Sequence, residues 1–149
     1  MRHVPLAAAI SIFAGTALAQ TPEDAVEARH GFMTMLSIEM GTLSAMAKGE
    51  MPYDEAAATD AAQNLMALTN YNAPKLFVEG TSSEDIDNSD ALPAIWQDRG
   101  DFEQKYAALA EAAQGIDQQV TGGQESLGPV VQNLGLACRD CHDSYRQDR

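Results

Sequence analysis

Apolar residues recur at intervals of three and four along most of the chain, which is the spacing of one face of an α-helix. This pattern predicts four helices, over residues 22–48, 55–69, 93–120 and 127–145. Thr21 precedes the first and Asp54 the second, and both residue types are preferred N-caps. No segment has the alternating pattern of a strand. The chain is therefore expected to be all-α, an antiparallel four-helix bundle.

Two connections in this bundle are short and one is long. Residues 75–92, between the second and third helices, are polar, rich in Asp and Ser and without a period, so they are expected to form a solvated loop. The sequence shows no internal repeat, and we expect residues 20–149 to form one domain.

The first 19 residues have the pattern of a secretory signal peptide. A basic start is followed by an apolar stretch, which is short for a membrane span, and Ala17-Leu18-Ala19 forms a cleavage site. We therefore expect export, to the periplasm in a bacterium, with cleavage after Ala19 and no membrane insertion of the mature chain. Removing Arg2 lowers Lys+Arg from 9 to 8 against 22 acids, a net charge of −14. Such an acidic surface argues against nucleic acid as a partner.

The chemistry concentrates in the fourth helix, at Cys138-Arg139-Asp140-Cys141-His142. Cys-x-x-Cys-His is the attachment motif of a c-type haem, in which two thiols add to the porphyrin vinyl groups and the histidine binds iron. On a helix, Cys141 and His142 lie about 60° and 40° to either side of Cys138, so all three point into one arc. We expect one covalent haem c.

Other interpretations of this motif are weaker. A zinc site needs further ligands, and only His3 and His30 remain. A thioredoxin-like motif would follow a strand near the start of a chain. A structural disulfide is possible but leaves the histidine unexplained.

The chain resembles the class II c-type cytochromes, and among them cytochrome c′. The resemblance rests on Pro22–Val26 with Arg29 one turn later, Pro52–Asp54, Pro93–Trp96, and Cys138–His142 near the C-terminus. It implies a four-helix bundle, commonly a homodimer, with one haem that is usually five-coordinate and high-spin. Small diatomic gases such as nitric oxide would bind it, and its redox partner protein is unknown.

The resemblance also implies roles for individual residues. Arg29, a charge on the buried stripe of the first helix, would bind a haem propionate. Arg146 would lie beside the proximal face. His30, Thr81 and Ser82 occupy further positions of haem contact, although relatives often carry Gln in place of His30 and have a shorter, less acidic loop after Gly80.

The role of Met33, one turn after Arg29, decides between two hypotheses for function. As an apolar wall, it would leave a five-coordinate haem for electron transfer or gas binding. As a thioether ligand opposite His142, it would give a six-coordinate, low-spin electron carrier. A peroxidase would need a polar acid–base group beside the iron, and only His30 is available among apolar neighbours such as Phe32 and Leu36. We therefore do not expect an enzyme.

Overall fold

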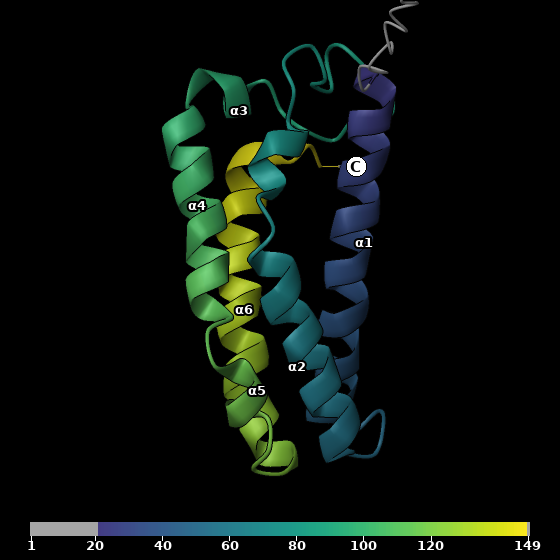
Figure 1. Ribbon diagram of the computed structural model, residues 1–149, viewed down its shortest axis with the longest axis vertical. Helices are drawn as coiled ribbons and strands as arrows, with labels where there is room; N and C mark the ends of the chain where they lie inside the picture. The colour runs from purple at the N-terminus through teal and green to yellow at the C-terminus, as the bar shows by residue number, and fades with distance from the viewer. Residues whose placement is uncertain (1–20, 149) are drawn as a thin grey trace, which may run out of the picture.

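The structure, a computed structural model, describes residues 21–148, so the predicted signal peptide lies outside the described residues. Four long helices run side by side (Figure 1). They are α1 (Pro22–Ala47), α2 (Glu55–Thr69), α4 (Arg99–Ala112) and α6 (Gln124–Tyr145). They form the predicted all-α, antiparallel four-helix bundle. Among residues 21–148, no helix has both the length and the apolar character needed to cross a bilayer.

Side-chain caps begin the first two helices where the sequence predicted. The Thr21 hydroxyl accepts from the Asp24 amide, and the Asp24 carboxylate accepts from the Thr21 amide in return, which forms a capping box. The Asp54 carboxylate accepts from the Ala57 amide at the start of α2. These bonds satisfy backbone donors that a helix leaves without partners in its first turn.

The prediction of one continuous helix over residues 93–120 was wrong. This segment forms α3 (Ala94–Gln97), α4 and α5 (Ile116–Gln119). Asp98 leaves helical geometry, with φ −133° and ψ 71°, and its carboxylate accepts from the Asp101 amide to cap α4. Gly115 has φ +66°, a left-handed conformation that glycine adopts without steric cost, and it separates α4 from α5. Hydrophobic spacing did not reveal these breaks because it continues across them.

The connection between α2 and α3 is only partly the solvated loop that was predicted. It starts with a 3₁₀ helix, η1 (Ala73–Leu76). Its acidic side chains at Glu84, Asp85 and Asp87 are exposed, but Thr81 and Ser89 are buried. A polar loop side chain is buried only where it has a hydrogen-bond partner, and the partner here is a side chain of α1, described below.

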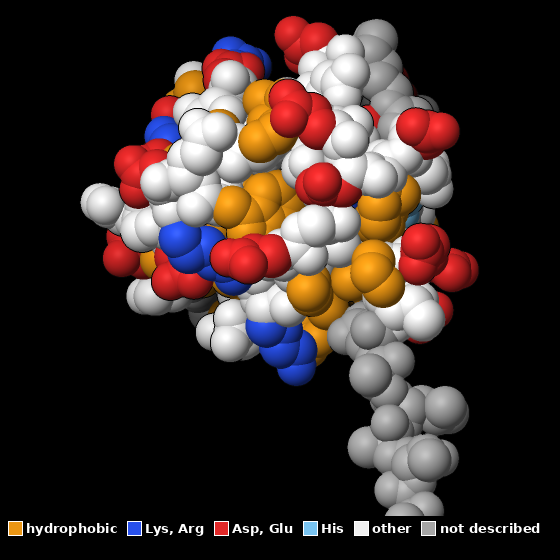
Figure 2. Space-filling model, turned by 90° about the horizontal axis from the view of Figure 1, so that it is seen from above, with side chains coloured by type: hydrophobic (Ala, Val, Ile, Leu, Met, Phe, Trp, Pro, Cys, Tyr) orange, Lys and Arg blue, Asp and Glu red, His pale blue; other side chains and the backbone are white. Residues whose placement is uncertain are grey.

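The hydrophobic core has two parts. The larger cluster follows the middle and lower bundle around Leu43, Leu65 and Leu134, and a smaller one at the upper end contains Ile95 and Phe102. Seen from above, that upper end shows acidic side chains spread over the surface, with apolar side chains exposed among them (Figure 2).

Candidate cofactor site

A cavity of about 690 Å³ opens between α1, α4, α6 and the end of the long loop. Packed protein interiors leave few voids larger than a water molecule, whereas ligand sites occupy roughly 300–1,000 Å³. The space exists partly because one stretch of the wall from α6 carries small residues, Gly135, Ala137 and Cys138. Its volume and lining are those of a site for a sizeable ligand.

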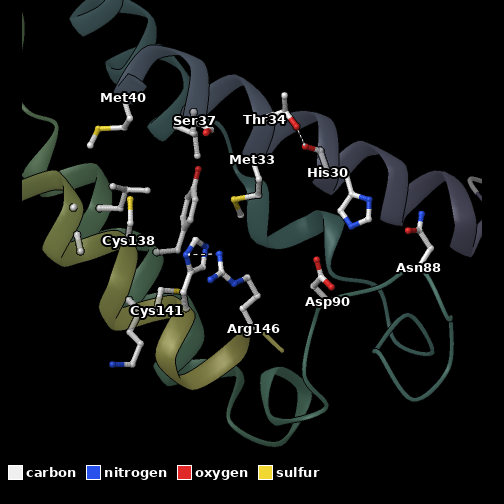
Figure 3. A pocket seen from close by; sticks show the side chains of 17 residues that line it. His30, Met33, Thr34, Ser37, Met40, Asn88, Asp90, Cys138, Cys141 and Arg146 are labelled. Atoms are coloured by element: carbon white, nitrogen blue, oxygen red, sulfur yellow. Dashed lines mark hydrogen bonds between the residues drawn. The ribbon is translucent and has the colours of Figure 1, made fainter. Parts of the chain in front are cut away.

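The two ends of the cavity differ in polarity. The lower part is mainly apolar, and its larger side chains are Met33, Leu36, Met40, Tyr106 and Leu109. The upper end is polar, where His30, Asn88, Asp90 and Arg146 come together from α1, the loop and α6 (Figure 3). A second cavity of about 220 Å³ shares His30, Met33, Asp90, Cys141, His142 and Arg146 with the first and is also lined by Arg29.

Both cysteines of α6 line the cavity, one turn apart. Burial raises the pKa of the Cys138 thiol and raises that of Cys141 to about 11, with the charge of Lys105 opposing the shift at Cys141. Neutral thiols are weak nucleophiles. In the folded chain both cysteines therefore stand beside the cavity as neutral thiols.

His142 also lines both cavities. Burial lowers its pKa, as does the charge of Arg146, while Asp143 acts in the opposite direction. The neutral imidazole that results is the form that binds a metal. Arg146 Nη1 lies 3.3 Å from His142 Nδ1. A guanidinium can only donate, so in this contact Nδ1 is the acceptor and the ring proton is assigned to Nε2.

Arg29 joins α1 to the long loop through three hydrogen bonds. Its Nη1 donates to Thr81 Oγ1 at 2.7 Å, and its Nη2 donates to the Thr81 carbonyl at 2.9 Å and to Ser89 Oγ at 3.0 Å. The guanidinium carbon also lies 4.9 Å from the centre of the Phe77 ring. The side chain is only 4% exposed, and burial lowers its pKa. The three bonds use three of its five donors and end on uncharged oxygens.

A charged pair links α4 to the turn that carries the cysteines. Lys105 Nζ lies 2.6 Å from Asp140 Oδ2, which raises the pKa of Lys105. Lys105 also lines the larger cavity. The pair connects α4 to α6 within the motif, because Asp140 lies between the two cysteines.

The structure brings most of the predicted site residues together. Cys138, Cys141, His142, His30, Met33 and Arg146 line the larger cavity, and Arg29 lines the smaller one. Thr81 and Ser82 line neither, although Thr81 holds Arg29 in place.

Sequence reasoning missed Asn88, Asp90 and Lys105, which also line the larger cavity. The helical stripe of residues 93–120 does contain Tyr106 and Leu109, so the periodic pattern identified these two as buried but not as lining a site.

These residues fit a haem. The apolar lower part suits the faces of a porphyrin, and the polar upper end suits its two carboxylates. Two thiols on adjacent turns of α6 match the two vinyl groups, and His142 stands next to the second thiol. Met33 lies on α1, across the cavity from α6 (Figure 3).

Comparison with known proteins agrees with this fit. The profile of the family described as "Cytochrome C'" matches residues 24–146. Cytochrome c' from Cereibacter sphaeroides is 41% identical over 149 residues, covering 100% of both chains. Cytochrome c-554 from the same organism is 42% identical over 151 residues, covering 99% of each chain.

Solved structures give the same result. Cytochrome c' from Rhodobacter Spheriodes superposes with a TM-score of 0.83 at 42% identity, covering 87% of this chain and 99% of that one. A nitric oxide complex of a mutant cytochrome c prime from Alcaligenes xylosoxidans has a TM-score of 0.73 at 30% identity, covering 85% and 97%. The chain therefore belongs to the cytochrome c′ family and binds haem c, and its two cysteines, Cys138 and Cys141, line the cavity in positions consistent with covalent attachment.

Proposed function

We propose that the chain is a periplasmic haem protein with a five-coordinate iron, which transfers electrons, binds small gases such as nitric oxide, or does both. When bound, haem supplies an iron that gains or loses one electron and accepts a diatomic gas. The observation that carries the proposal is the position of His142 on α6, with apolar side chains of α1 across the same cavity. The nitric oxide complex of a relative supports gas binding.

His142 is proposed as the ligand on one side of the iron. Binding through Nε2 requires the ring proton to move to Nδ1, which then no longer accepts from Arg146. Arg146 is exposed, so its side chain is free to turn away from the ring toward solvent. Arg146 would then lie beside the proximal face, as the family resemblance implies.

Met33 and Leu36 are proposed as the wall on the opposite side. Leu36 is 8% exposed and belongs to the main hydrophobic cluster, against which Met33 also packs. These side chains offer a gas no hydrogen-bond donor, and a packed wall has to shift before a ligand enters. Phe32, the third apolar candidate, is buried and lines neither cavity.

The remaining donors of Arg29 are proposed for a haem propionate. A buried cation is costly without an anion nearby, and its three hydrogen bonds end on uncharged oxygens. A propionate reaching the smaller cavity would supply negative charge through a charge-assisted hydrogen bond.

A homodimer through α1 and α2 is also proposed. Ile38 is 60% exposed and Met35 is 48% exposed, one turn apart on the outer face of α1. Large apolar side chains grouped on a surface often mark an interface. An acidic surface around the site would suit a redox partner with a basic docking face.

Optical spectra of the oxidised and reduced protein test the coordination. We expect broad high-spin bands in both states, and Met33→Ala should leave them high-spin while speeding the entry of carbon monoxide into the reduced protein. Met40→Ala is the matched control, because Met40 is a second cavity thioether on α1.

Sharp low-spin bands that Met33→Ala abolishes and Met40→Ala retains would identify Met33 as the sixth ligand. The chain would then be a six-coordinate electron-transfer cytochrome. The position of Met33 across the cavity from His142 makes this the second candidate function.

A further inference from the structure

Tyr145 and Tyr106 lie against the two cavities, and their hydroxyl groups are bonded in different ways. Tyr145, in the last turn of α6, lines the smaller cavity together with Cys141 and His142. Tyr106, on α4, lines the larger cavity. The proposed function gives neither hydroxyl a role.

The hydroxyl of Tyr145 is held on a carboxylate. Its Oη donates to Asp101 Oδ2 at 2.7 Å, which joins the end of α6 to the first turn of α4, the helix beside it (Figure 1). The ring is 7% exposed and packs edge-on against Phe102, with centroids 5.4 Å apart and ring planes at 88°. The Leu92 amide donates to the Tyr145 carbonyl at 3.0 Å. Ring, backbone and hydroxyl are therefore all fixed in place.

This hydrogen bond decides how easily the phenol loses an electron. A phenol that has lost an electron is a strong acid, so its oxidation is much easier where a base takes the proton at the same time. Burial raises the pKa of Tyr145 to about 12, and the hydrogen bond to Asp101 acts in the same direction, so Tyr145 is a neutral phenol near neutral pH. Carboxylates are ionised near neutral pH and accept protons. Asp101 is only partly buried, so it can pass a proton on to solvent.

Tyr106 and Trp96 are oxidisable side chains without such an acceptor. Tyr106 Oη donates to the Tyr71 carbonyl at 2.6 Å, and a peptide carbonyl accepts a hydrogen bond without taking up the proton. The buried Trp96 Nε1 has no hydrogen-bond partner within residues 21–148. Of these three side chains, Tyr145 alone donates to a group that takes up a proton.

We propose that Tyr145 is a redox-active residue, which gives up one electron when a hydroperoxide reacts at the haem site and passes its phenolic proton to Asp101. This inference rests on the proposed function, in which the sixth position of the iron is open to small molecules. Tyr145 lines the same small cavity as Cys141 and His142, so only a short path separates its ring from the haem site.

The electrons and protons of this reaction balance. Reduction of hydrogen peroxide to two water molecules breaks the O–O bond and takes up two electrons and two protons. When bound, ferrous haem supplies one electron and becomes ferric. Tyr145 supplies the other electron and becomes a neutral phenoxyl radical. Solvent supplies the two protons, and the phenolic proton stays on Asp101. The chain is oxidised once, so Tyr145 is an acceptor of oxidising equivalents and the reaction is not turnover.

Electron paramagnetic resonance tests the inference. The haem-loaded ferrous protein is mixed with one equivalent of hydrogen peroxide without oxygen and frozen rapidly. The wild type should show ferric iron together with a tyrosyl radical, whose signal narrows when the protein is made with ring-deuterated tyrosine. Tyr145→Phe keeps the ring against Phe102 and should lose the radical signal. Asp101→Asn should lose most of it, because an amide does not take up the proton.

Tyr106→Phe is the matched control, because it removes the other cavity hydroxyl, and it should keep the radical signal. A second measurement needs no variant. A proton held on Asp101 donates back to the phenoxyl oxygen, so electron–nuclear double resonance of the wild type should detect one hydrogen-bonded proton that exchanges in deuterated water. A radical on Tyr106 would face a carbonyl, which has no proton to donate.

Three results overturn the inference. Iron that is oxidised by peroxide without a radical would show that Tyr145 gives up no electron. A radical that persists in Tyr145→Phe would assign the electron to another side chain, such as Tyr106 or Trp96. Both results leave the proposed function intact. Ferrous protein that peroxide does not oxidise would show that the iron is closed to small molecules, which would refute the five-coordinate haem as well.

Discussion

Replacing Arg29 with Met removes the three hydrogen bonds that hold the long loop against α1. Hydrogen bonds to charged groups contribute about 1.5–3 kcal/mol each. Removing the guanidinium also removes the cost of burying its charge, which is several kcal/mol. The loop oxygens keep other partners, because Thr81 Oγ1 donates to the Val78 carbonyl and Ser89 Oγ donates to the Thr81 carbonyl. We therefore expect Arg29→Met to lower the free energy of unfolding by about 2–3 kcal/mol, which is in the range of typical substitutions in a protein core.

Unfolding of the haem-loaded protein in guanidinium chloride, followed by circular dichroism, measures this loss. With a slope of about 4 kcal/mol/M for a chain of this size, the midpoint should fall by about 0.5–0.8 M. Lys48→Met is the control: it removes one exposed positive charge far from the loop and should change the free energy of unfolding by less than about 0.5 kcal/mol.

The loss of stability should be concentrated in the long loop. The amides of Ser83 and Ser89 donate within the loop, to the carbonyls of Ala91 and Ile86. Their hydrogen exchange should accelerate in Arg29→Met more than exchange in the centre of the helices. A variant as stable as the wild type, with unchanged loop exchange, would refute the idea that Arg29 anchors this segment.

Three further predictions follow from other parts of the structure. Acid and organic solvent should leave the haem on the chain, bound through Cys138 and Cys141, and haem that moves into the organic phase would contradict thioether attachment. Ile38→Glu should reduce the sedimentation mass from two chains to one, whereas Val78→Glu, at another exposed apolar residue, should not. Hydrogen bonds from the Ser82 hydroxyl and amide lower the pKa of Asp85. Its contribution to the free energy of unfolding should therefore be present above about pH 4 and fall as pH decreases through the lowered pKa, a dependence that Asp85→Asn should lose.

The fold was predictable because the information for it is local. Helical spacing and the caps Thr21 and Asp54 depend on residues within one or two turns of each other. The spacing of the Cys138–His142 motif places both cysteines and the histidine on one arc of a helix, and this does not depend on the rest of the chain. The breaks around α4 were missed because Asp98 and Gly115 change the backbone without interrupting the hydrophobic pattern.

The loop was not predictable in the same way. Its composition indicated a solvated segment, and its acidic tip is exposed, but Thr81 and Ser89 are buried by contacts with Arg29, which lies 52 and 60 positions earlier. The sequence did indicate that Arg29 needed a partner. Only the folded chain shows which loop oxygens are partners, and a propionate contact remains a prediction.

The attachment of the long loop at Thr81 and Ser89 has a consequence for protein engineering. Both residues are fixed to α1 by the same guanidinium, while Glu84, Asp85, Asp87 and Asn88 between them are exposed. Exposed loop tips tolerate insertion because little backbone packing is disturbed. A binding peptide or an affinity tag inserted after Asp87 would be displayed next to the haem cavity, while the two anchor points keep its wall in place.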